Sequence, residues 1–271
     1  MLDTPWYARA AQVHLPRMDS DTARYEAPIR TIHPADRMWQ PEESWYFATG
    51  RSALRLVDIA ARASWLPRIS SILDLPCGHG RVARYLRSGY PDAKLHFCDI
   101  DADGADFCAS TFDGTAIHSR PELTEVALPQ VDLIWVGSLF THVDLERTRR
   151  WLRHLCESLT PDGVLVASFH GDWSIRMHQD FYPMIDPVSW ERILDGYRAS
   201  GYGYAPYPHG RFGDYGVSLS RPETMIGVVR EIPGVRMVGY MERGWADNHD
   251  VIMIARDDRD TPWSPSFRTR R

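Results

Sequence analysis

The chain has 271 residues, of which 44% are hydrophobic and 25% charged, a composition typical of a globular protein. It has 31 Lys and Arg against 36 Asp and Glu, and the net charge of −5 argues against nucleic-acid partners, which need a basic surface. No apolar run approaches the roughly 18 residues of a membrane helix, and the N-terminus lacks a signal sequence, so we expect a cytoplasmic protein without a membrane partner.

Residues 1–49 contain five prolines and no sustained hydrophobic periodicity, and we expect them to form an N-terminal arm or lid. Apolar side chains at helical spacing predict a helix over 50–65, which opens the main domain at 50–256. The four cysteines form no C-x-x-C pair, which favours reduced thiols, and the sequence predicts no metal site.

Short apolar runs alternate with helical patterns from residue 69 onward. We predict strands over 69–75, 94–101, 131–138 and 164–170, with helices after the first of these and over 103–112 and 144–159. This alternation is typical of an α/β protein with a doubly wound, mostly parallel sheet.

The segment 173–231 breaks this alternation with many aromatic residues and glycines, and we expect an insertion that covers the site. Two further strands are predicted over 235–242 and 250–256, and their short connection favours antiparallel pairing. We interpret Trp245 and His249 in this region as structural residues. The polar tail 257–271 is predicted to be mobile.

The segment ILDLPCGHGRVARYL (72–86) carries the strongest functional signal, because its glycines lie where a predicted strand leads into a helix. Gly78 and Gly80 permit a tight turn that brings a ligand close to main-chain N–H groups. Asp99 follows Gly80 by 19 residues at the end of the next strand, where a carboxylate can accept the hydroxyls of a ribose.

Two ligand classes suit this pattern, namely dinucleotides and S-adenosylmethionine. GHGRVA satisfies the dinucleotide form G-x-G-x-x-A. However, Asp74 would repel a pyrophosphate and could instead hold an ammonium group. These residues alone leave both classes open.

The chain resembles the class I S-adenosylmethionine-dependent methyltransferases of the small-molecule branch. The resemblance is carried by DLPCGHG (74–80), FCDID (97–101), DLIWVGSLFTHV (132–143) and TPDGVLVASF (160–169), and it covers about 50–172 and 232–256. It implies a Rossmann-like, seven-stranded sheet whose last strand is antiparallel, and S-adenosylmethionine as the cofactor.

The resemblance also implies a set of cofactor-binding residues. Cys77, Gly78 and Gly80 would hold the methionyl part through their backbone, and Asp74 its amino group. The remaining implied contacts are Asp99 to the ribose, Ile100 to the adenine, Arg51 to the cofactor carboxylate, Gly137 and Ser138 beside the sulfonium, and Ser119 in place of an acid common in the family.

His142 follows the predicted strand 131–138, His170 ends the predicted strand 164–170, and both are candidate catalytic bases. The alternatives are that His142 only packs and that His170 bonds to Asp172. We expect methyl transfer to a small-molecule acceptor, favouring a hydroxyl of a sugar or secondary metabolite. A small amine acceptor, an NAD(P)-dependent oxidoreductase, a non-catalytic cofactor-binding subunit and a homo-oligomer remain open.

Overall fold

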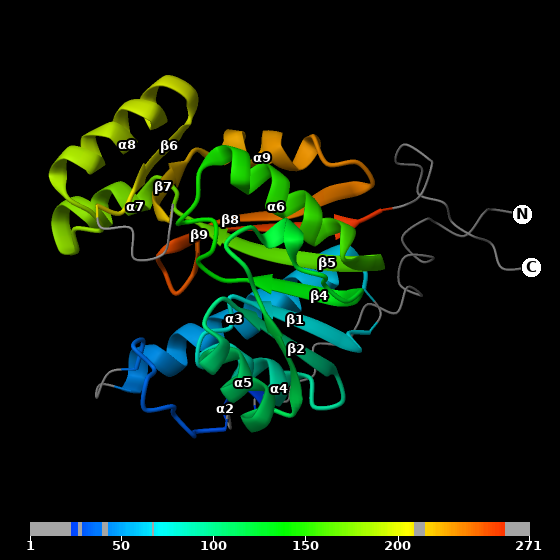
Figure 1. Cartoon of the computed structure of the whole chain (residues 1–271). Helices are drawn as coiled ribbons and strands as arrows, with labels where there is room; N and C mark the ends of the chain where they lie inside the picture. The colour runs from blue at the N-terminus through cyan, green and yellow to red at the C-terminus, as the bar shows by residue number, and fades with distance from the viewer. Residues whose placement is uncertain (1–22, 27–28, 40–42, 67, 209–214, 258–271) are drawn as a thin grey trace, which may run out of the picture.

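The main sheet has seven strands in the order β3-β2-β1-β4-β5-β9-β8 (Figure 1). The computed structural model describes residues 23–26, 29–39, 43–66, 68–208 and 215–257. Neighbouring strands from β3 to β5 are parallel, whereas β9 is antiparallel to β5 and β8, which confirms the predicted fold class. The strands are β1 (Ser71–Leu75), β2 (Lys94–Asp99), β3 (Gly114–His118), β4 (Val131–Val136), β5 (Leu159–Phe169), β8 (Val235–Trp245) and β9 (His249–Arg256).

Helices cover both faces of this sheet, as Figure 1 shows. One buried core packs against α6 (Leu145–Glu157) and α9 (Pro222–Arg230), and the other packs against α3 (Glu43–Ser64), α4 (Ala83–Gly89) and α5 (Ala102–Thr111). The central strands are therefore buried on both sides, which explains their nearly continuous apolar sequences. Among the described residues, no helix is long and apolar enough to cross a bilayer.

Helix α3 begins at Glu43, so part of the expected arm is helical. The described arm, which includes α2 (Ala23–Glu26), packs beside α4. Arg84 of α4 anchors it, because this fully buried side chain donates hydrogen bonds to the carbonyl oxygens of Ile29 and Thr31. A buried guanidinium needs such acceptors, and backbone carbonyls supply them here.

The predicted insertion divides into two parts. The elements α8 (Pro187–Ser200), β6 (Tyr202–Pro206) and β7 (Gly216–Ser220) share a small core of their own, whereas α9 packs on the main sheet. Asp186 caps α8 by accepting a hydrogen bond from the N–H of Ser189, and Gly201 ends the helix with a φ of 77°. Short helical turns, η1 (Leu123–Glu125), α7 (Trp173–Arg176) and η2 (Met177–Phe181), complete the described fold.

The four cysteines are buried and form no disulfide in this structure. Residues 1–22 and 258–271, which hold much of the expected arm and tail, lie outside the described part of the chain.

Candidate active site

Two cavities meet at the ends of β1, β2 and β4. The Asp99 cavity has a volume of about 260 Å³, and its lining residues include Asp99, Ile100, Ser119, Leu139 and Tyr215. The Arg81 cavity has a volume of about 320 Å³ and is lined by Met38, Trp45, Thr49, Arg81, Ser138, His142, His170, Tyr182, Met184, Tyr207, Val217, Trp245, Ala246, Asn248 and His249. Ser138 and His142 line both cavities, so this pair marks their junction.

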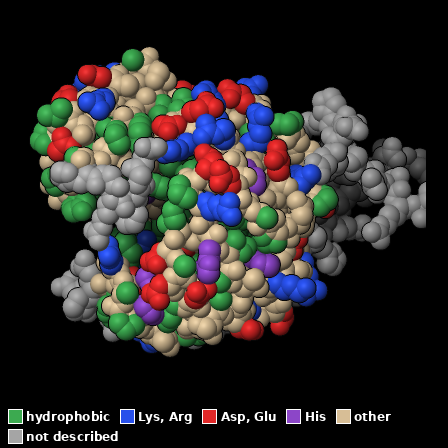
Figure 2. Space-filling view, in the orientation of Figure 1, with side chains coloured by type: hydrophobic (Ala, Val, Ile, Leu, Met, Phe, Trp, Pro, Cys, Tyr) green, Lys and Arg blue, Asp and Glu red, His purple; other side chains and the backbone are tan. Residues whose placement is uncertain are grey.

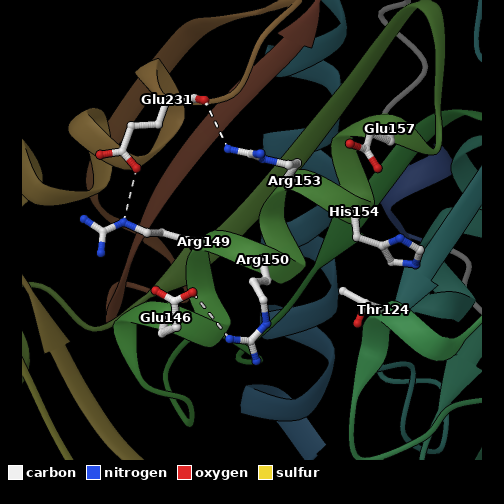
Figure 3. Close-up of a pocket in the computed structure, with 8 residues that line it drawn as sticks. All are labelled: Thr124, Glu146, Arg149, Arg150, Arg153, His154, Glu157 and Glu231. Atoms are coloured by element: carbon white, nitrogen blue, oxygen red, sulfur yellow. Dashed lines mark hydrogen bonds and ion pairs between the residues drawn. The ribbon is translucent and has the colours of Figure 1, made fainter.

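A third pocket lies along α6 and is lined by Thr124, Glu146, Arg149, Arg150, Arg153, His154, Glu157 and Glu231 (Figure 3). Its arginines are engaged, since Arg149 pairs with Glu231 and Arg150 with Glu146. Figure 2 shows acidic and basic side chains interspersed over this side of the molecule. We interpret this pocket as a solvated network of surface ion pairs.

The glycine loop between β1 and α4 adopts the left-handed backbone that its glycines permit. The φ angles of Gly78 and Gly80 are 49° and 88°. A Cβ atom on Gly80 would lie 2.3 Å from the ring of Phe112, whereas one on Gly78 would meet no atom within 4 Å. Gly80 is therefore needed for packing, and Gly78 borders open space in which a ligand can lie.

The loop's N–H groups do not form the expected anion cradle. Cys77 donates to the carbonyl oxygen of Cys98 at 3.1 Å, Gly80 donates to Cys77 at 3.1 Å, and the N–H of Gly78 donates to Asp99 Oδ2 at 2.7 Å. These three N–H groups are thus engaged within the protein, and the contact of the loop's backbone with the methionyl part stays a prediction. A pyrophosphate would find all three engaged within the protein, which argues against a dinucleotide.

Asp99 lies where the sequence predicts it, at the end of β2 and on the wall of its cavity. Its Oδ1 accepts a hydrogen bond from the N–H of Asp101 at 2.9 Å. Burial raises the pKa of Asp99, and the hydrogen bonds from Asp101 and Gly78 oppose that rise. The carboxylate is thus fixed by two N–H donors, and Ile100 and Ser119 line the same cavity.

Asp74, at the base of the loop, is a buried acid without a compensating donor. Its side chain is 1% exposed, and neither oxygen has a hydrogen-bond partner among the described residues. Burial, followed by the nearby charge of Asp99, raises the pKa of Asp74 well above its usual range. An unpaired buried carboxylate is costly, and an ammonium group would satisfy it. Asp74 therefore fits the amino group of S-adenosylmethionine.

Arg81, the residue that follows the glycine loop, lines the larger of the two cavities that meet at Ser138 and His142. Its guanidinium carbon lies 5.5 Å from the ring centroids of both Trp45 and Trp245, and its buried Nη1 has no partner among the described residues. Burial lowers the pKa of Arg81. Arg51 lines neither cavity. Arg51 stays a predicted partner of the cofactor carboxylate, and Arg81 is a second candidate whose signal in the sequence is its position directly after the GHG loop.

His142 and His170 hold the same tautomer, because each ring bonds to a carbonyl oxygen of β7. The Nδ1 of His142 lies 2.8 Å from the oxygen of Gly216, and that of His170 lies 3.0 Å from the oxygen of Ser218. Since a carbonyl can only accept, each Nδ1 carries the proton and each Nε2 keeps a lone pair. Among the described residues His170 makes no hydrogen bond to Asp172, because its Nδ1 bonds to Ser218, while Asp172 accepts from Tyr197.

Burial lowers the basicity of both histidines, and His170 is the weaker base. Burial lowers the pKa of His142, and it lowers the pKa of His170 to about 3, with the neighbouring His142 contributing. Both rings are therefore neutral near pH 7. A base whose conjugate acid has a pKa of about 3 accepts a proton poorly, so His142 is the better candidate.

Two residues interpreted as structural line the Arg81 cavity. His249 lies 5.0 Å from His170 between ring centroids, and Trp245 packs against His249 at 5.3 Å. Burial lowers the pKa of His249 well below its usual value. The purely structural interpretation is therefore incomplete. The feature of the sequence that could have indicated a role for these residues is the short β8–β9 connection, because it places aromatic and polar side chains at the sheet edge.

At the junction, the backbone turns sharply after β4. Ser138 has a φ of 63°, and its N–H donates to Ser168 Oγ at 2.8 Å. A Cβ atom on Gly137 would lie 2.8 Å from the indole nitrogen of Trp135, so only glycine fits there without displacement. Ser138 lines both cavities, and the placement of Gly137 and Ser138 beside the sulfonium stays a prediction.

Comparison with known proteins agrees with this geometry. Residues 73–165 match the family model of a methyltransferase domain, and no curated protein matches the sequence. The fold is similar to an O-methyltransferase family protein from Burkholderia thailandensis (TM-score 0.51, 16% identity, covering 81% of this chain and 60% of that one). It is also similar to human N-acetylserotonin methyltransferase in complex with SAM (TM-score 0.51, 16% identity, covering 78% of this chain and 52% of that one). A third similar structure is an S-adenosylmethionine-dependent methyltransferase from Clostridium acetobutylicum (TM-score 0.54, 10% identity, covering 76% of this chain and 92% of that one).

These identities are low, so the structural similarities establish a shared fold. The chain spans only 60% and 52% of the Burkholderia and human proteins, but 92% of the Clostridium protein. The family match covers β1 to β5, which carry the glycine loop, Asp99 and the junction. Residues 73–165 therefore match a methyltransferase domain, and the chain shares the fold of these methyltransferases.

Proposed function

We propose that the protein transfers the methyl group of S-adenosylmethionine to a hydroxyl of a small, largely apolar acceptor. The observation that carries this proposal is the meeting of the two cavities at Ser138 and His142. A cofactor with its adenosine in the Asp99 cavity and its methionyl group toward Asp74 and Arg81 would place its sulfur at this junction. The acceptor would then approach through the Arg81 cavity.

The bound cofactor supplies a methyl group that is already activated by a positive sulfur. The protein's task is therefore to align the acceptor at about 3–3.5 Å and to exclude water. His142 would take the hydroxyl proton on Nε2, while its Nδ1–H remains bonded to Gly216. His170, with its low pKa, serves as a neutral wall of the cavity and a poor base.

The lining of the Arg81 cavity supports an aromatic or otherwise apolar acceptor over a sugar. It contains no Asp or Glu among the described residues, and acidic side chains are common hydrogen-bond acceptors for hydroxyl groups. Its apolar side chains Met38, Trp45 and Tyr182 are 50%, 53% and 69% exposed. Such exposed apolar side chains beside a cavity favour contact with an apolar ligand.

Calorimetric titration with S-adenosylhomocysteine, with NADH titrated in parallel, tests the cofactor. We expect micromolar binding of the first and none of the second, and NADH binding alone would overturn the assignment. Transfer of labelled methyl groups to a panel of phenols, sugars and small amines tests the acceptor. Methylated phenols support the proposal, whereas products from sugars or amines alone would replace its acceptor class.

A further inference from the structure

Two histidines and an aspartate from separate segments meet beside the glycine loop. His33 belongs to the described arm, His79 lies between Gly78 and Gly80, and Asp103 is in the first turn of α5. One ligand atom from each residue lies within 4.8 Å of the other two. In the described part of the chain, no other group of three or more His, Cys, Asp or Glu residues meets this criterion.

The distances in this cluster are close to those of a metal centre. Asp103 Oδ2 lies 3.3 Å from His79 Nε2 and 3.6 Å from His33 Nδ1. A tetrahedral ion with bonds of about 2.0–2.1 Å separates its ligand atoms by about 3.3–3.4 Å. Both distances to the carboxylate therefore lie near the required value, and the ligand atoms of the two imidazoles lie within 4.8 Å of each other.

Binding one ion requires the two rings to turn, because nearly parallel, stacked imidazoles do not direct their lone pairs at one point. The rings stack at 4.7 Å with an angle of 14° between their planes, and Phe107 packs against His33 at 4.9 Å. The Nδ1 of His33 also accepts a hydrogen bond from the N–H of Ala35 at 3.2 Å. This bond is exposed, so water can satisfy the N–H group of Ala35 if a metal ion takes the lone pair.

We propose that His33, His79 and Asp103 bind one zinc ion. Two imidazoles and a carboxylate suit zinc and similar transition metals, whereas magnesium and calcium prefer oxygen ligands. The carboxylate side chain of Asp103 is 62% exposed, so water can complete the coordination. The ion would join the N-terminal arm to the glycine loop and to α5. It takes no part in the proposed methyl transfer.

Titration of the chelator-treated full chain with zinc chloride tests the site, with calorimetry giving affinity and stoichiometry. Cobalt chloride provides an optical readout, because bound cobalt in a tetrahedral site absorbs visible light. We expect one zinc ion per chain with micromolar affinity, and no comparable binding of magnesium. Each of the variants His33→Ala, His79→Ala and Asp103→Asn should weaken zinc binding at least tenfold.

His118→Ala is the matched control, because His118 forms a similar exposed pair with Asp106 at 2.8 Å but belongs to no three-ligand group. It should bind zinc as the unmodified chain does. Circular dichroism establishes that each variant is folded. Zinc binding that survives in all three ligand variants, or that is lost in His118→Ala, places the ion elsewhere and overturns the proposal, as does the absence of binding at millimolar zinc.

Discussion

The Nδ1 of His142 lies 2.8 Å from the carbonyl oxygen of Gly216, and the N–H of Gly216 in turn donates to the carbonyl oxygen of His142 at 2.9 Å. Further along β7, the N–H of Ser220 donates to the carbonyl oxygen of His170 at 3.0 Å. The inserted strand thus runs beside the loops after both β4 and β5. It therefore orients the rings of the two histidines, in addition to lying over the site.

Replacement of His142 by Gln tests its role as the base. The amide can still donate to Gly216, but it cannot accept the proton of the acceptor hydroxyl. We expect kcat to fall by about 10²–10⁴, with the affinity for S-adenosylhomocysteine changed only a few-fold. In the unmodified protein, the lowered pKa of His142 places the acid limb of kcat/KM below pH 6.5, since the neutral ring is the active form.

His170→Gln is the control for this experiment, because the low pKa of His170 makes it a poor base. It should retain most of the turnover. If His142→Gln turns over normally per folded molecule and only unfolds more easily, His142 is a packing residue and the base lies elsewhere.

Arg81 and Arg51 can be distinguished by two ligands that differ only in the amino-acid part. Arg81→Gln should weaken the binding of S-adenosylhomocysteine about 10–100-fold, because a charge-assisted hydrogen bond contributes about 1.5–3 kcal/mol. Binding of 5′-methylthioadenosine, which lacks the carboxylate, should not change. Arg51→Gln should bind both ligands normally. An equal loss of both ligands in Arg81→Gln would indicate a disturbed fold and remove the assignment.

The buried carboxylate of Asp74 should cost stability until the cofactor arrives. Asp74→Asn keeps the shape and removes the charge, so we expect weaker cofactor binding together with a more stable ligand-free protein. The pKa of Asp74 is raised in the folded state, so the wild type loses stability relative to the variant as pH rises above about 3.8 toward that raised value. Urea unfolding of both proteins between pH 4 and 9 measures this difference, and parallel curves would contradict it.

The sequence predicts those parts of the molecule that depend on local patterns. The alternation of strands and helices predicts six of the seven strands of the main sheet and misses β3 (Gly114–His118), whereas the offset between Gly80 and Asp99 predicts the acid that lines the cavity. Arg81 illustrates what local patterns miss. Its position directly after the GHG loop is local, but its place beside the cavity depends also on Trp45 and Trp245, which are 200 residues apart in the chain and whose ring centroids both lie 5.5 Å from its guanidinium carbon.

The same limit applies to groups assembled from distant segments. His33 and His79 are separated by 46 positions, and their stacking depends on how the arm packs against the glycine loop. The bond from His142 to Gly216 spans 74 positions and depends on the register of an inserted strand. Neither spacing resembles a motif, so only the folded chain reveals these contacts.

His170 should make the protein sensitive to mild acid. Its pKa is about 3 in the folded state against about 6.5 when unfolded, so the unfolded chain binds the proton more readily below pH 6.5. The contribution of His170 to the free energy of unfolding is therefore fully present above pH 6.5 and is lost as pH falls, by about 2 kcal/mol at pH 5 from this group alone.

Urea unfolding at pH 6.5 and pH 5 should show that His170→Gln loses less stability than the wild type over this interval. His118→Gln, which changes an exposed ring, should lose as much as the wild type. Equal losses in all three proteins would mean that His170 becomes protonated without unfolding, and that its neutral tautomer is not required by the fold.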